Sequence, residues 1–68
     1  MDEARWSGGE TNLLFYNVKT GKLFGEIWSD RDGKWFAFVD GNQVGEYSSK
    51  ESAQNAIEVR YHTKGGNA

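Results

Sequence analysis

The stretch GKWFAFVDGNQVGEY, residues 33–47, decides the fold of this chain, because it contains two strand signals joined by a hairpin turn. Residues 35–39 are apolar at every position, and residues 44–47 provide a return strand. Between them stand Asp40 and Gly41, residue types that readily adopt the left-handed backbone conformation of a two-residue hairpin loop. The stretch therefore predicts an antiparallel hairpin.

Working outward, the chain repeats this pattern upstream and then changes its period. LLFYNV (residues 13–18) and LFGEIW (residues 23–28) are separated by the glycine-containing turn KTGK, which predicts a second hairpin. From Ser48 the apolar period becomes about 3.6, and Ser48 with Glu51 has the spacing of a capping box, so a helix should begin there. We therefore predict an α+β fold, an antiparallel four-stranded meander (ββββα) packed on one C-terminal helix.

The chain ends look less ordered than residues 13–64, which we take as the single domain. Residues 1–12 mix charge, Gly8, Gly9 and one Trp6, which favours a flexible N-terminal arm. Residues 65–68 begin with two glycines and should form a disordered tail.

Alternation along the strands leaves both sides of the sheet apolar, although one helix can cover only one side. A helix that presents Ala53 and Ala56 leaves room for one large ring next to small residues. The side of the sheet that carries Trp35 beside Ala37 should therefore face the helix and form the core. The predicted core residues are Trp35, Ala37, Val39, Leu23, Ile27 and Ile57. The helix-free side should then carry four aromatic side chains, a predicted protein-binding face: Phe24, Trp28, Phe36 and Phe38.

The sequence allows three groups to cover this second side of the sheet. The N-terminal arm with Trp6 could fold over it and complete an ordinary core. A partner protein or a second copy of the chain (a homodimer) could bind it, because exposed apolar patches rimmed by charge mark interaction sites. Single-stranded nucleic acid could stack on its rings, with Lys22, Arg31 and Lys34 as the cations.

Charge weighs against nucleic acid. The 68 residues include 8 Lys and Arg against 10 Asp and Glu, a formal net charge of -2, and no basic stripe stands out. The polar, acidic start MDEARWSGGE does not resemble a secretory signal, and no apolar run approaches the roughly 20 residues of a membrane span. We expect a cytoplasmic protein that contacts no membrane.

Residues 23–61 resemble the three-strand-plus-helix DNA-binding domains of plant ethylene-response factors and the arm-binding domains of phage tyrosine recombinases. The matching pieces are GKWFAFV on the middle strand, VGEY on the last strand and SSKESAQNAI at the helix start. The resemblance implies a sheet face, opposite the helix, that reads the DNA major groove with Arg, Lys and Glu. Here the corresponding positions hold Phe36 and Phe38 on the middle strand, and Val44 and Glu46 on the last strand.

No residue pattern indicates catalysis or a cofactor. His62 stands near the helix end without a nucleophile at a meaningful spacing, so we expect a surface histidine. Asp30 and Asp32 alternate in a turn but lack the further oxygen ligands of a calcium loop. The chain has no cysteine, so no thiolate metal site is available. We predict a small non-catalytic binding module without metal, cofactor or small-molecule substrate, similar to accessory proteins of phages and mobile elements.

Overall fold

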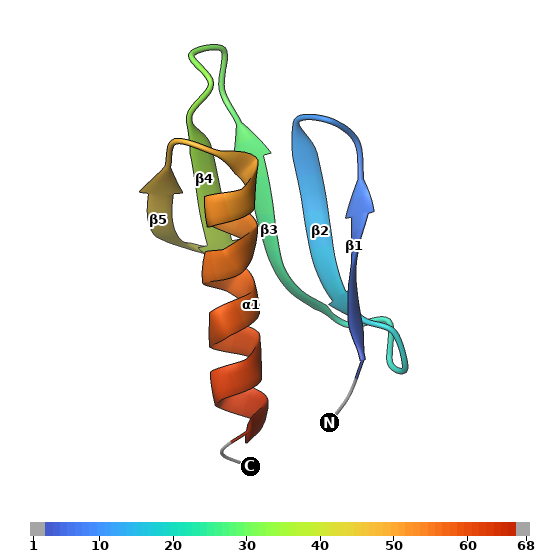
Figure 1. Ribbon diagram of the computed structural model, residues 1–68. Helices are drawn as coiled ribbons and strands as arrows, with labels where there is room; N and C mark the ends of the chain where they lie inside the picture. Colours follow the sequence, from blue (N-terminus) through green and yellow to red (C-terminus); the bar gives the residue numbers. More distant parts are fainter. Residues whose placement is uncertain (1–2, 67–68) are drawn as a thin grey trace.

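The computed structural model describes the backbone of residues 3–66 and the side chains of residues 3–63. One antiparallel sheet has its strands in chain order, and a single helix lies across one of its faces (Figure 1). The elements are β1 (Ala4–Gly8), β2 (Asn12–Asn17), β3 (Leu23–Ser29), β4 (Trp35–Val39), β5 (Asn42–Tyr47) and α1 (Lys50–Gly66). The α+β meander is confirmed, but it has five strands where the sequence predicts four.

The additional strand is β1, which lies in the segment predicted to be a flexible arm. It pairs with β2 along its whole length, and Trp6 stands opposite Phe15, with ring centroids 4.6 Å apart. The Trp6 indole Nε1–H also donates to Glu58 Oε2 of α1 at 2.7 Å. One large aromatic residue therefore anchors a short edge strand whose other residues are small or polar. At the other end, α1 continues to Gly66, so the predicted disordered tail begins within the helix; residues 67 and 68 lie outside the described residues.

Local turn and cap chemistry sets the boundaries of the last elements. Asp40 and Gly41 have φ values of 55° and 82°, as the two-residue loop predicted between β4 and β5 requires. The helix begins one residue later than the sequence predicts. Ser49 is its N-cap, because Ser49 Oγ accepts from the Ser52 amide at 3.2 Å and the Ser49 carbonyl accepts from the Ala53 amide. The predicted pairing of Ser48 with Glu51 is wrong.

The core lies between the sheet and α1, which packs over β3, β4 and β5. Its buried members are Phe15, Ile27, Ala37, Ala53 and Ile57, and Trp35 and Val39 are partly buried against them. Leu23 is an error in the predicted core, since it is 46% exposed. Gly25 takes the place beneath the helix, where an added Cβ would stand 3.1 Å from Ile57 Cδ1 and Cγ2.

Two register shifts explain why simple alternation misplaces some side chains. Tyr16 pairs with Leu23 whereas Phe15 pairs with Gly25, so Phe24 is the extra residue of a bulge. A second shift in β5 makes Val44 the extra residue, and Val44 packs against the core. A bulge residue does not follow the two-residue period of its strand. Phe24 and Val44 therefore lie on the core side, although simple alternation places both on the opposite face.

Candidate functional site

The candidate site is the sheet face opposite α1, which we call the helix-free face. Residues that pair directly across antiparallel strands share a face, so the register defines its members. In one row, Asn12, Trp28, Phe36 and Glu46 lie side by side from β2 to β5, and in the next row Leu14, Glu26, Phe38 and Gln43 do so. Tyr16 and Leu23 extend the face toward the β2–β3 turn.

Three of these side chains form an aromatic cluster at the centre of β3 and β4, namely Trp28, Phe36 and Phe38. The Trp28 ring is tilted by 36° against Phe36 at a centroid distance of 4.8 Å, and it is parallel within 11° to Phe38 at 6.2 Å. Trp28 remains 38% exposed, while Phe36 and Phe38 are half-buried beside it. The rings thus hold one another in place and still present an apolar surface to solvent.

Phe24, the fourth predicted member, does not lie on this face. Its ring contacts Tyr61 of α1 at a centroid distance of 5.1 Å and Phe15 of β2 at 6.5 Å, both edge to face. The bulge at Phe24 turns this side chain toward the helix. Phe24 therefore contributes to the core side, and the prediction that it belongs to the binding face is wrong.

The N-terminal segment does not cover the helix-free face either. Trp6 packs on Phe15 and bonds Glu58 of α1, both on the opposite side of the sheet. Within residues 3–66, α1 packs on the other face and β1 is a strand of the sheet itself. Of the three coverings that the sequence allows, the arm is excluded for this described part of the chain.

Charge on the helix-free face is mostly paired. Arg5 Nε contacts Glu3 Oε2 at 2.9 Å, and Lys34 Nζ contacts Glu46 Oε2 at 3.3 Å. Glu26, which is half-buried between the central strands, accepts from the Asn12 side-chain amide at 3.2 Å. No cation pairs with Glu26 among the side chains of residues 3–63. Glu26 is not among the site residues that the sequence predicts, although its place two residues before Trp28 puts both on one face of β3.

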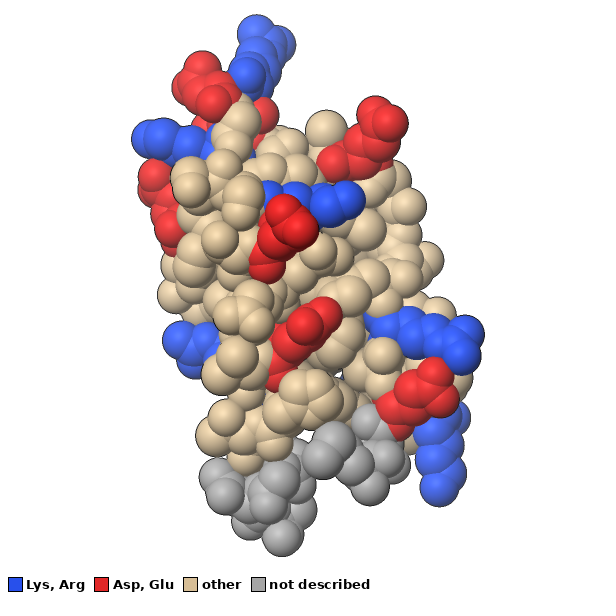
Figure 2. Space-filling view, in the orientation of Figure 1, with Lys and Arg blue, Asp and Glu red and all other residues tan. Residues whose placement is uncertain are grey.

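The three cations predicted for nucleic acid are not brought together. Lys22 lies in the β2–β3 turn and Arg31 in the β3–β4 turn, at opposite ends of the sheet in Figure 1. The seven residues of β3 between them span about 20 Å at the usual rise per residue. Lys34 is already paired with Glu46. The side that carries α1 also mixes both signs of charge (Figure 2).

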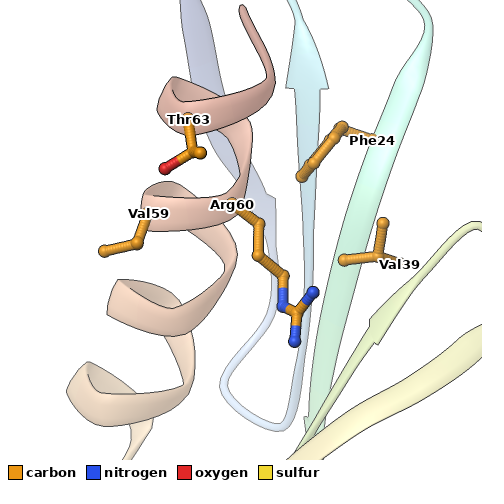
Figure 3. Close-up of a pocket in the computed structure, with 5 residues that line it drawn as sticks. All are labelled: Phe24, Val39, Val59, Arg60 and Thr63. Atoms are coloured by element: carbon orange, nitrogen blue, oxygen red, sulfur yellow. The ribbon is translucent and has the colours of Figure 1, made fainter. Parts of the chain in front are cut away.

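A surface pocket lies between the C-terminal half of α1 and the strands β3 and β4 (Figure 3). It has a volume of about 440 Å³ and is lined by Phe24, Val39, Val59, Arg60 and Thr63. The Arg60 side chain extends from α1 into the space between the helix and the strands (Figure 3). Since Val59 is 54% exposed, this is an open notch on the surface.

The remaining candidate residues have structural roles or no ligand geometry. Asp30 Oδ1 accepts from the amides of Asp32 and Lys34, which is how an aspartate stabilises a turn. His62 is exposed, and its ring meets Tyr61 edge to face. No group of three or more metal-ligating side chains occurs in the described part of the chain. Nor does any helix described there have the length and apolar character of a membrane span.

Comparison with known protein families, with curated proteins and with solved structures finds no match to this chain.

Proposed function

We propose that this chain is a small non-catalytic binding module that contacts another protein through its helix-free face, in the manner of a phage or mobile-element accessory protein. The observation that carries the proposal is the aromatic cluster of Trp28, Phe36 and Phe38 on a sheet face that no described element covers. Aromatic side chains are enriched at the centres of protein interfaces, where they supply much of the binding energy.

The exposed surface of Trp28 gives an estimate of the binding free energy that a partner gains by covering it. About 38% of a tryptophan surface of roughly 250 Å² leaves about 95 Å² in water, and burying it is worth about 2 kcal/mol at ~25 cal/mol per Å². Leu14 and Leu23 on the same face are 38% and 46% exposed and add to this amount. A polar rim with Asn12, Glu46 and paired charges surrounds the apolar centre, as in typical protein interfaces.

Nucleic acid is the alternative occupant, because stacked bases also bind exposed sheet aromatics. The positions of Lys22 and Arg31 at opposite ends of β3, and the pairing of Lys34 with Glu46, count against it. Nucleic acid would also have to bring phosphates near Glu26, whose negative charge repels them.

Site-specific photocrosslinking tests the proposal. A photoreactive residue at Leu14 reports on the helix-free face, and the same residue at Val59 reports on the exposed outer side of α1. In lysate of the native source, we expect a discrete protein adduct from position 14 and none from position 59. The position-14 adduct should disappear when Phe36→Ser and Phe38→Ser are combined, or in Trp28→Thr, which retains a strand-forming residue. Adducts that are sensitive to nuclease, or that form equally from both positions, would refute the proposal.

Sedimentation of the purified chain separates a foreign partner from a second copy. A homodimer through this face would dissociate in Trp28→Thr and persist in Val59→Ser. Circular dichroism of each variant confirms that the sheet and helix are retained.

A further inference from the structure

We infer that the protein bound at the helix-free face brings an arginine, whose guanidinium lies over Trp28 and pairs with Glu26. This inference rests on the proposed function and names the chemistry of its partner. The carboxylate of Glu26 lies among the apolar side chains of this face and has no cation partner among the described side chains.

Glu26 is the negative charge on the helix-free face that has no cation partner among the described side chains. The two cations of this face, Arg5 and Lys34, are already bound to Glu3 and Glu46. The Asn12 amide satisfies one carboxylate oxygen of Glu26 but does not neutralise it. A partner that covers the face must therefore remove water from an unpaired carboxylate, which is costly unless a cation replaces the water.

The surroundings of Glu26 favour arginine over other cations. Phe38 stands directly opposite Glu26 on β4, and Trp28 follows two residues along β3, roughly 7 Å away along the strand. A guanidinium is planar, so it can stack on an indole ring and donate two parallel hydrogen bonds to a carboxylate at its edge. An ammonium can occupy the same place but makes no bidentate pair. The aromatic cluster provides a ring for stacking, and Glu26 provides a carboxylate for the paired hydrogen bonds of a guanidinium.

The same carboxylate disfavours the two other occupants. In a dimer of two helix-free faces packed centre to centre, the two Glu26 side chains approach each other without a cation between them. A nucleic acid places phosphates there. Glu26→Gln should therefore strengthen self-association or nucleic-acid binding, and it should weaken the binding of a basic segment. The sign of this one substitution separates a basic protein segment from the two other occupants.

Titration with blocked peptides tests the inference. The probes are acetyl-Ala-Leu-Arg-Leu-Ala-amide and two matched peptides with Gln or Lys in place of Arg, followed by the NMR signals of the Trp28 indole and the Glu26 side chain. We expect the Arg peptide to bind about tenfold more tightly than the Gln peptide, with the Lys peptide between them. This preference should weaken as salt is raised.

Variants of the chain establish where the preference arises. Glu26→Gln is nearly isosteric, so it should retain the fold and reduce the Arg-to-Gln affinity ratio to nearly one. Glu51→Gln, in the exposed first turn of α1, is the matched control and should leave the ratio unchanged. Equal affinities for the three peptides, or an Arg preference that survives Glu26→Gln, would overturn the inference.

The two proposals can fail separately. If the peptides bind equally but the photoreactive residue at Leu14 still captures a protein, the arginine inference is wrong and the protein-binding function stands. If position 14 captures nothing and none of the peptides perturbs Trp28, both are wrong.

Discussion

Replacement of Gly25 by alanine tests the close packing of α1 on β3, which leaves the opposite face of the sheet uncovered. An added Cβ at position 25 would lie 2.8 Å from the Phe38 carbonyl oxygen and 3.1 Å from Ile57 Cδ1 and Cγ2. The ordinary contact distance is at least 3.4 Å, so α1 must move away by about 0.3 Å and β4 by about 0.6 Å. The Phe38 oxygen is backbone in the sheet, where movement disturbs the strand ladder.

Two opposing terms set the magnitude. Overpacking of this kind costs about 1–3 kcal/mol. Glycine in a strand is itself unfavourable by about 0.5–1 kcal/mol, so alanine recovers that amount where it fits. We expect Gly25→Ala to lower the free energy of unfolding by about 1–2 kcal/mol. In urea this shifts the midpoint down by about 1–2 M, since m is near 1 kcal/mol per M for a chain of this size.

Urea unfolding followed by tryptophan fluorescence and circular dichroism measures the change. Gly9→Ala is the matched control, because an added Cβ there meets nothing within 4 Å, and its midpoint should stay unchanged or rise. Ile57→Val removes Cδ1, so the loss caused by Gly25→Ala should be smaller in the Ile57→Val background than in the wild type. A midpoint that rises in Gly25→Ala, or strict additivity with Ile57→Val, would refute the close approach of α1 to β3.

Three further predictions concern contacts that fix the ends of the fold. Trp6→Phe removes the donor to Glu58 and should lower the free energy of unfolding by about 1 kcal/mol, with faster amide hydrogen exchange in β1 than in β4; equal exchange in both strands would contradict this anchoring role. Ser49→Ala should lower the free energy of unfolding in urea by about 1 kcal/mol, whereas Ser48→Ala should change it by less than ~0.5 kcal/mol. The reverse order would show that Ser48 is the N-cap. Lys34→Ala breaks an ion pair whose two side chains are 58% and 50% exposed, so the change should be less than ~0.5 kcal/mol; a larger loss would show that the pair is coupled to the rest of the face.

Local signals in the sequence predict most of this fold, because they depend on neighbouring residues alone. The pair Asp40-Gly41 specifies a turn with positive φ, and the alternation of Trp35, Ala37 and Val39 specifies which side of β4 faces the helix. In contrast, β1 depends on tertiary contacts: the segment ARWSG is short and half polar, and it is held through Trp6. Such an edge strand has no distinct local pattern.

The candidate site was predicted in part. Trp28, Phe36 and Phe38 follow strand alternation without interruption and lie where the sequence places them. The face predicted for Phe24 is wrong because a bulge in β3 breaks the two-residue period, and no residue type in the segment LFGEIW indicates a bulge. Glu26 was visible in phase with Trp28, but its importance depends on the absence of a nearby cation, which only the described side-chain contacts reveal.

Glu26 also helps to explain why the helix lies where it does. Had α1 packed on the aromatic side, it would have removed water from this carboxylate, at a cost of several kcal/mol unless a cation of the helix paired with Glu26, and the net stability of a small domain is only of order 5 kcal/mol. The other side offers Gly25 and Ala37, small enough for Ile57 to approach closely. Close packing on these small residues and the desolvation cost of Glu26 both favour this side for the helix, and the rings of the opposite side are left uncovered. The same desolvation cost applies to any partner that covers the helix-free face, and a cation on the partner, placed beside Glu26, offsets that cost.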